Sequence, residues 1–323
     1  MYGWGGSTSD WKKAGKYDWN SARKPYMDKL ADDADKKGPR TYSRPLKPNE
    51  KLVNTNGKII QTSSENPIVV AIDVTGSMKS WPAEIFDRLP LLYQTLSQYR
   101  PDTEICFAAI GDANCDQYPL QVNDFGKGLE LEEKIRALYP EGGGGGQISE
   151  SYELFAYYML EKCNMPNAKS PFLLVYGDEN FYDTISARQV EYYIGDKLAS
   201  DPNSDSVWRK LLQKFDLYFL QKEYGDGDMR VTKEVNGRWA TAIGEQRIIS
   251  LPSAERAVDV AMALIAKKWG EFGDFKKNIS ARQDESERNA VYSSVRHVVD
   301  EIAGDNSVTV KAKSTTRKTK PLA

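Results

Sequence analysis

Short apolar runs divide the chain from Ile68 onward. The run "IVVAID" at 68–73 is apolar at successive positions and so on both faces, which is typical of a strand inside a parallel sheet. The segments "TEICFAAIGD", "SPFLLVYGDE", "FDLYFLQK" and "QRIISL" continue this pattern, and "YPLQVNDF" is a shorter, more polar strand that suits a sheet edge. The hydrophobic pattern therefore predicts a sheet of six strands.

Segments with helical periodicity separate these strands. Apolar side chains recur every three or four positions from Ile85 to Tyr99, in a segment that Pro90 is expected to kink or split. Further helical patterns are "LELEEKIRALY", "SESYELFAYYMLEK" with Ser149 as its N-cap, "TISARQVEYYIGDKL" and "SAERAVDVAMALIAKKWG". Because strands and helices alternate, the sequence predicts an α/β fold with a mostly parallel sheet that is covered by helices on both faces.

The two ends of the chain differ in composition from this central region, 66–270. Residues 1–65 contain Trp4, Trp11 and Trp19 among many polar residues, so we expect an aromatic, polar arm that either packs on the domain or binds a partner. A helical extension is predicted over 271–303. The basic tail at 304–323 is rich in Ser and Thr and is expected to be disordered.

Composition narrows the class of protein. The chain of 323 residues has 40% hydrophobic and 28% charged residues, which suffices for one large domain with extensions. A net charge of −2 gives no reason to expect a nucleic-acid or membrane partner, and three cysteines without a C-x-x-C motif predict neither a disulfide framework nor a zinc site. No signal-peptide pattern or membrane-length apolar run is present, so we expect a cytoplasmic protein, or one of the host cytoplasm if it is phage-encoded.

A carboxylate and two hydroxyls follow the first predicted strand. Asp73, Thr75 and Ser77 occupy alternate positions, so their side chains are able to converge on one point as the chain leaves the sheet. Carboxylate and hydroxyl oxygens are hard ligands that suit Mg²⁺ best, with Mn²⁺ or Ca²⁺ as alternatives. A cation held by so few charges keeps open positions at which an external carboxylate can bind.

Two other interpretations of this stretch stay open. In a phosphatase of the haloacid-dehalogenase type, Asp73 would be the nucleophile, but the general acid expected two positions later is replaced by Thr75. In the plainer interpretation, Asp73, Thr75 and Ser77 merely cap the helix that follows. The single histidine, His297, excludes a histidine-based catalytic triad, and we expect no enzymatic activity.

Two further loops are predicted at the same edge of the sheet, where ligands bind in open α/β folds. The loop "EGGGGGQISES" has glycines that let the backbone come close, and it carries Gln147, Ser149 and Glu150. The loop "VYGDEN" places Asp178 directly after a strand. This convergence favours a cation site over simple helix capping.

At this point the chain resembles a von Willebrand factor A domain over about residues 66–270. The stretch "AIDVTGSM" matches the D-x-[ST]-x-S loop of that family's metal-ion-dependent adhesion site, with Asp73, Thr75 and Ser77 as ligands. Asp178 matches the aspartate of the third loop, although the family reads Asp-Gly and this chain reads "GDE". The second loop lacks the family's threonine, so Ser149 is its best substitute, followed by Glu150 or Gln147.

The resemblance implies both a topology and a role. It implies a doubly wound, mostly parallel sheet in which "YPLQVNDF" is an antiparallel edge strand. It also implies a protein-binding scaffold in which an acidic residue of the partner completes the shell of a divalent cation. Stand-alone prokaryotic and phage members often work in assemblies with MoxR-type AAA+ ATPases, which makes such an ATPase a candidate partner. The main alternative is a structural or assembly protein that keeps the fold with a vestigial metal site.

Overall fold

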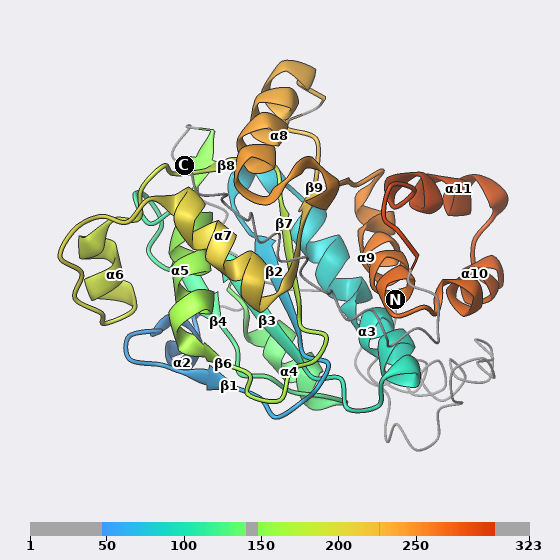
Figure 1. Ribbon diagram of the computed structural model, residues 1–323, viewed down its shortest axis with the longest axis horizontal. Coiled ribbons are helices and arrows are strands. Elements are labelled where there is room, and N and C mark those ends of the chain that lie inside the picture. The colour runs from blue at the N-terminus through green and yellow to red at the C-terminus, as the bar shows by residue number, and fades with distance from the viewer. Residues whose placement is uncertain (1–46, 140–147, 226, 301–323) are drawn as a thin grey trace, which may run out of the picture.

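A six-stranded sheet forms the centre of the computed structural model, which describes residues 47–139, 148–225 and 227–300 (Figure 1). The strand order is β10–β9–β7–β2–β3–β4, and every neighbouring pair is parallel except β3–β4. The strands are β2 (Ile68–Asp73), β3 (Ile105–Ile110), β4 (Leu120–Val122), β7 (Phe172–Gly177), β9 (Asp216–Gln221) and β10 (Ile248–Ser250). The predicted α/β fold is confirmed, including the antiparallel edge strand formed within "YPLQVNDF".

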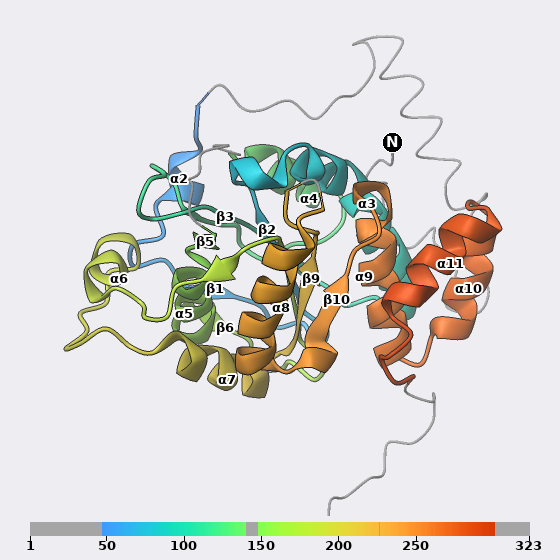
Figure 2. The ribbon, with the colours of Figure 1, turned by 90° about the horizontal axis from the view of Figure 1, so that it is seen from above.

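Helices cover both faces of this sheet, as Figure 2 shows from above. Alternate residues of each strand face opposite sides, so Val70 and Ile72 pack in one core and Val69 and Ala71 in the other. The first core is shared with α3 (Trp81–Tyr99), α4 (Glu130–Ala137) and α9 (Ala254–Lys268). The second is shared with α5 (Tyr152–Lys162), α6 (Ala187–Tyr193), α7 (Ser204–Lys214) and α8 (Met229–Ile243).

Smaller elements complete the described chain. Helix α2 (Glu50–Val53) and strand β1 (Ile60–Gln61) precede the sheet, and β1 pairs with β6 (Cys163–Asn164). Strand β5 (Ser149–Glu150) pairs with β8 (Asn180–Phe181), and two short 3₁₀ helices are η2 (Gly76–Met78) and η3 (Glu245–Arg247). Helices α10 (Phe272–Ser280) and α11 (Glu285–Ser294) lie against α9 (Figure 1).

The predicted terminal segments are described only in part. Residues 47–65 contain α2 and β1, in which Leu52 and Ile60 are buried. Residues 271–300 contain α10 and α11 of the predicted helical extension. The rest of the predicted arm and the whole basic tail at 304–323 lie outside the described residues. None of the helices that the structure describes combines the length and the apolar character needed to cross a membrane.

Two local predictions need correction. Helix α3 runs without a break through Pro90, which is itself buried, so the predicted split does not occur. The apolar stripe of α3 packs closely along α9, and this packing holds the helix together where the proline removes one hydrogen bond. Helix α5 begins after Ser151 and not after Ser149, because Ser149 and Glu150 pair with β8 as a strand.

Candidate metal centre

The loop after β2 brings its three predicted side chains together. Asp73 is the last residue of β2. Its carboxylate Oδ1 atom accepts hydrogen bonds from the Thr75 N–H at 2.8 Å and from the Thr75 hydroxyl at 2.6 Å. The Thr75 hydroxyl also lies 3.3 Å from the Ser77 hydroxyl. Neither η2 nor α3 receives a capping hydrogen bond from the side chain at its N-cap, Thr75 and Ser80 respectively. Simple helix capping therefore does not account for these residues.

Asp178 joins this group across the sheet. Strands β2 and β7 are parallel neighbours in which Ile72 pairs with Tyr176, so the chain leaves both strands at the same level. The Ser77 hydroxyl donates a hydrogen bond of 2.9 Å to Asp178 Oδ1, and the Asp178 side chain is fully buried. The structure thus places Asp73, Thr75, Ser77 and Asp178 in one hydrogen-bonded cluster.

Two glutamates enter the same cluster from β5 and from the loop after β7. Glu150 is 2% exposed and Glu179 is 3% exposed, and their carboxyl groups are hydrogen-bonded to each other. Glu179 also contacts the Ser77 hydroxyl. Among the described residues, Glu150 Oε2 and Glu179 Oε2 have no hydrogen-bond partner. We call Asp73, Glu150, Asp178 and Glu179 the acidic cluster.

Burial and mutual repulsion shift the protonation of this cluster. Burial is the largest cause and neighbouring carboxylates are the next, because both disfavour the charged form. Together they raise the pKa of Asp73 to about 7, that of Glu179 to about 8 and that of Glu150 to about 11. Such an arrangement is electrostatically suited to a bound cation, which would favour the ionised carboxylates.

Lys222 contacts the acidic cluster, and the sequence analysis did not predict it as a site residue. It directly follows β9, and its ammonium lies 2.7 Å from Asp178 Oδ2, with side chains 4% and 0% exposed. The same ammonium donates to the Glu223 carbonyl at 3.0 Å. A lysine immediately after the apolar strand "DLYFLQ", at the sheet edge already predicted to bind ligand, was the available signal.

Tyr152 and Gly177 form a second feature that sequence reasoning missed. The buried Tyr152 hydroxyl donates a hydrogen bond of 2.5 Å to Asp73 Oδ2, from the first turn of α5. A Cβ atom on Gly177 would lie 2.1 Å from that hydroxyl oxygen, so a larger residue there would displace the tyrosine ring. This close approach explains why the chain reads "GDE", with glycine before Asp178.

The predicted second loop is described only in part. Gln147 lies outside the described residues. Ser149 pairs with Asn180, and its side chain has no hydrogen bond to Asp73, Thr75, Ser77 or Asp178 within the part of the chain described. Because successive strand residues face opposite ways, Glu150 and not Ser149 points into the acidic cluster. Of Ser149 and Glu150, the two second-loop candidates that the structure describes, Glu150 is the one that it brings to the site.

The donor atoms fit a hard divalent cation. They are carboxylate and hydroxyl oxygens, which suit Mg²⁺, Mn²⁺ or Ca²⁺, and the orphaned buried oxygens of Glu150 and Glu179 provide unused acceptors. Within the described ranges, no group of three or more His, Cys, Asp and Glu side chains is arranged to hold a metal by itself. A cation here would therefore depend on the Thr75 and Ser77 hydroxyls and on water in addition to carboxylates.

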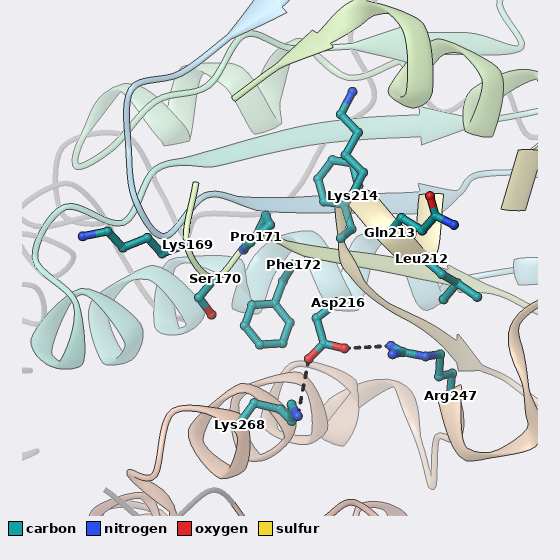
Figure 3. A pocket seen from close by; sticks show the side chains of 11 residues that line it. Lys169, Ser170, Pro171, Phe172, Leu212, Gln213, Lys214, Asp216, Arg247 and Lys268 are labelled. Atoms are coloured by element: carbon teal, nitrogen blue, oxygen red, sulfur yellow. Dashed lines mark hydrogen bonds and ion pairs between the residues drawn. The ribbon is translucent and has the colours of Figure 1, made fainter. Parts of the chain in front are cut away.

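A cavity of about 370 Å³ lies elsewhere, at the amino ends of β7 and β9 (Figure 3). Its wall is basic, but each cation has a partner: Arg247 and Lys268 lie 2.7 and 3.8 Å from Asp216. Lys214 donates to two backbone carbonyls of α5, and Lys169 pairs with a glutamate. We therefore assign no function to this cavity.

Comparison with known proteins gives no family for the chain. No protein-family model matches it, and no curated protein does. The solved structures similar to it include the pilus adhesin SpaC from Lactobacillus rhamnosus GG, with 12% identity, a TM-score of 0.46, and coverage of 66% of this chain and 32% of the adhesin. Proximal thread matrix protein 1 from the mussel byssus has 11% identity and a TM-score of 0.43, with 65% and 48% covered.

The PilB minor pilin from Streptococcus sanguinis is similar at the same level, with 10% identity, a TM-score of 0.42, and coverage of 69% of this chain and 65% of the pilin. The chain spans about a third of the length of the adhesin and about half that of the thread matrix protein. At such low identities and TM-scores, we draw no functional conclusion from these similarities.

Proposed function

We propose that this chain is a non-enzymatic, metal-ion-dependent protein-binding module. One observation carries the proposal: two carboxylates and two hydroxyls from separate loops meet in one buried cluster, with unpartnered glutamate oxygens beside them. Buried carboxylates are normally paired with cations or coordinate a metal. A cluster of buried carboxyl groups at the ligand-binding edge of an α/β sheet is therefore suited to a cation.

Different residues of the site would have different roles in holding this cation. The Thr75 and Ser77 hydroxyls have lone pairs that can turn toward it, Asp178 would supply negative charge, and Glu150 would supply more once the ion displaces its proton. Tyr152 holds Asp73 in place through its hydroxyl. The bound ion would supply an open coordination position for an acidic side chain of a partner protein, and burial of the cluster would keep water from weakening that contact.

The phosphatase alternative receives little support from this geometry. A nucleophilic aspartate needs a free oxygen that faces the substrate. The Asp73 side chain is fully buried, and its two oxygens accept hydrogen bonds from Thr75 and Tyr152. Attack by Asp73 would require both contacts to break.

A second candidate function is a structural or assembly protein with a vestigial metal site. The observation that favours it is the Lys222 ammonium on Asp178, because a built-in cation can replace an ion in balancing the cluster. In that case the fold and the charge network would be kept without metal binding. The two candidates differ in a measurable quantity, the affinity of the chain for divalent cations.

Calorimetric titration of the full chain with Mg²⁺, Mn²⁺ and Ca²⁺ tests the proposal. We expect binding of at least one of these ions to the wild-type chain, and its loss in Ser77→Ala, which removes one hydroxyl of the cluster. Ser200→Ala, at an exposed serine outside the cluster, is the matched control and should bind as the wild type does. Absence of binding by the wild-type chain for all three ions would refute the metal-dependent function and favour the structural one.

A further inference from the structure

Lys222 lies inside the candidate metal centre and not at its rim. Its backbone N–H donates to the Gly177 carbonyl at 2.9 Å, which continues the β9–β7 pairing and sets Lys222 beside Asp178. Its ammonium lies 2.7 Å from Asp178 Oδ2 and is anchored by the Glu223 carbonyl at 3.0 Å. Both charged side chains of the pair are almost completely buried.

The Asp178 carboxylate already has a donor on each oxygen. Oδ1 accepts from the Ser77 hydroxyl and Oδ2 accepts from Lys222. A divalent ion that used Asp178, directly or through a water molecule, would need one of these donors to move. The serine hydroxyl can rotate and offer a lone pair to the ion, whereas an ammonium has three donors and no lone pair. The lysine is therefore the group that conflicts with an ion.

We propose that Lys222 is a tethered cation that competes with a divalent ion for Asp178 and thereby sets the affinity of the centre for metal. This inference rests on the proposed function, because it takes the cluster as the place where an ion binds. Like charges repel strongly where water is excluded, so ion binding has to move the ammonium off Asp178. The four-carbon stem of a lysine is flexible enough for such a movement.

The same contact explains how the cluster is tolerated without an ion. An uncompensated buried carboxylate is costly, and removal of one partner from a buried ion pair strongly destabilises a protein. The Lys222 ammonium neutralises Asp178 in the ion-free chain. It therefore stabilises the fold before the ion arrives and lowers the affinity for the ion when it does.

Titration of the full chain with Mn²⁺ tests this competition. Lys222→Met keeps the apolar stem and removes the charge, so we expect Mn²⁺ to bind at least about tenfold more tightly than to the wild type, a difference of about 1.4 kcal/mol. Lys233→Met, at an exposed lysine of α8, is the matched control and should leave the affinity unchanged. Equal or weaker binding by Lys222→Met would overturn the inference while leaving the proposed function intact, provided that the wild type binds.

Other outcomes separate the two proposals. If the wild type binds none of Mg²⁺, Mn²⁺ and Ca²⁺ and Lys222→Met binds Mn²⁺, the competition is supported and the proposed function of the natural chain is refuted. If neither chain binds any of the three ions, both are refuted.

A measurement on the wild-type chain covers the case in which Lys222→Met does not fold. Acetic anhydride labels exposed lysines, and the labelled positions are read by mass spectrometry. Lys222 should be protected in the presence of a chelator and labelled when Mn²⁺ saturates the chain, whereas Lys233 should be labelled in both conditions. Protection of Lys222 that persists in a chain with bound Mn²⁺ would overturn the inference.

Discussion

Buried carboxylates at two places in this molecule are balanced in different ways. On α9, Asp259 is 2% exposed, forms ion pairs with Arg282 at 2.5 Å and Arg256 at 3.5 Å, and accepts a hydrogen bond of 2.6 Å from Gln283. At the carboxyl edge of the sheet, the acidic cluster places carboxylates beside other carboxylates, with Lys222 on Asp178. The first arrangement is what structural stability requires. The second relies on retained protons and on Lys222 for its compensation, and strongly perturbed carboxyl groups of this kind are candidates for a functional site.

The largest predicted effect of a single substitution concerns the Asp259 group on α9. Arg282→Met should leave Asp259 with less compensation in a buried position and lower the free energy of unfolding by about 3–5 kcal/mol. Urea unfolding measures this loss, with Arg209→Met at an exposed position of α7 as the control. Because Asp259 is balanced by arginines of the chain, addition of Mg²⁺ should restore none of the lost stability. Recovery on addition of Mg²⁺ would break the distinction between the two groups.

The next effect concerns the packing that positions Asp73. Gly177→Ala should force the Tyr152 hydroxyl away from its present place and lower the free energy of unfolding by about 1–3 kcal/mol. Tyr152→Phe in the same chain removes the atom nearest to the new methyl group, so the double variant should regain part of the loss. Thermal or urea unfolding of the two single variants and the double variant tests this coupling. Strictly additive losses would show that the contact does not matter.

The sequence predicted most of the fold because buried parallel strands and amphipathic helices leave strong periodic patterns. Helices α7 and α8 were not predicted, although their buried residues recur at helical spacing, Val207 and Leu211 in α7 and Val231 and Val235 in α8, so the missed signal was in the pattern itself. Pro90 shows a different limit, because a residue that breaks an isolated helix is held within α3 by its neighbours.

Some residues of the candidate site were predictable from the sequence and others were not. Asp73, Thr75, Ser77 and Asp178 were predictable, because each stands at a strand end and strand ends of a parallel sheet meet. Tyr152 carries no local motif, and its contact with Asp73 depends on a helix start that the sequence placed two residues too early. Lys222 is marked only by its place after an apolar strand, and its contact with Asp178 depends on the register between distant strands. Residue spacing alone does not determine which of Ser149 and Glu150 faces the cluster, whereas the β5–β8 pairing does.

A third prediction concerns the pH dependence of stability, which should distinguish the acidic cluster from Asp259. Burial and like-charge repulsion raise the pKa values of Asp73, Glu179 and Glu150 to about 7, 8 and 11, so in the folded chain these groups keep protons that the unfolded chain releases near pH 4. In the presence of a chelator, stability should therefore fall as pH rises from about 5 to 7, by about 1.4 kcal/mol per pH unit for each retained proton.

Urea unfolding across this range measures the slope. Glu150→Gln removes one of the titrating groups and should make the slope shallower, whereas Glu234→Gln, at an exposed position of α8, should leave it unchanged. Stability that is flat or that rises over this range would mean that the cluster is already compensated by charges of the chain, as Asp259 is.

The smallest effect on the free energy of unfolding is expected at the opposite edge of the sheet, where the amino ends of its parallel strands lie. Asp216 lies between Arg247 at 2.7 Å and Lys268 at 3.8 Å, and all three side chains are about a quarter exposed (Figure 3). Lys268→Met should lower the free energy of unfolding by less than about 1 kcal/mol, because water and salt screen a partly exposed pair and Arg247 remains on the same carboxylate. Urea unfolding at low and high salt measures it, and the difference from the wild type should shrink as salt is added. A loss as large as that of Arg282→Met would place the amino edge among the buried charge networks, and its basic cavity would then have to be explained by stability alone.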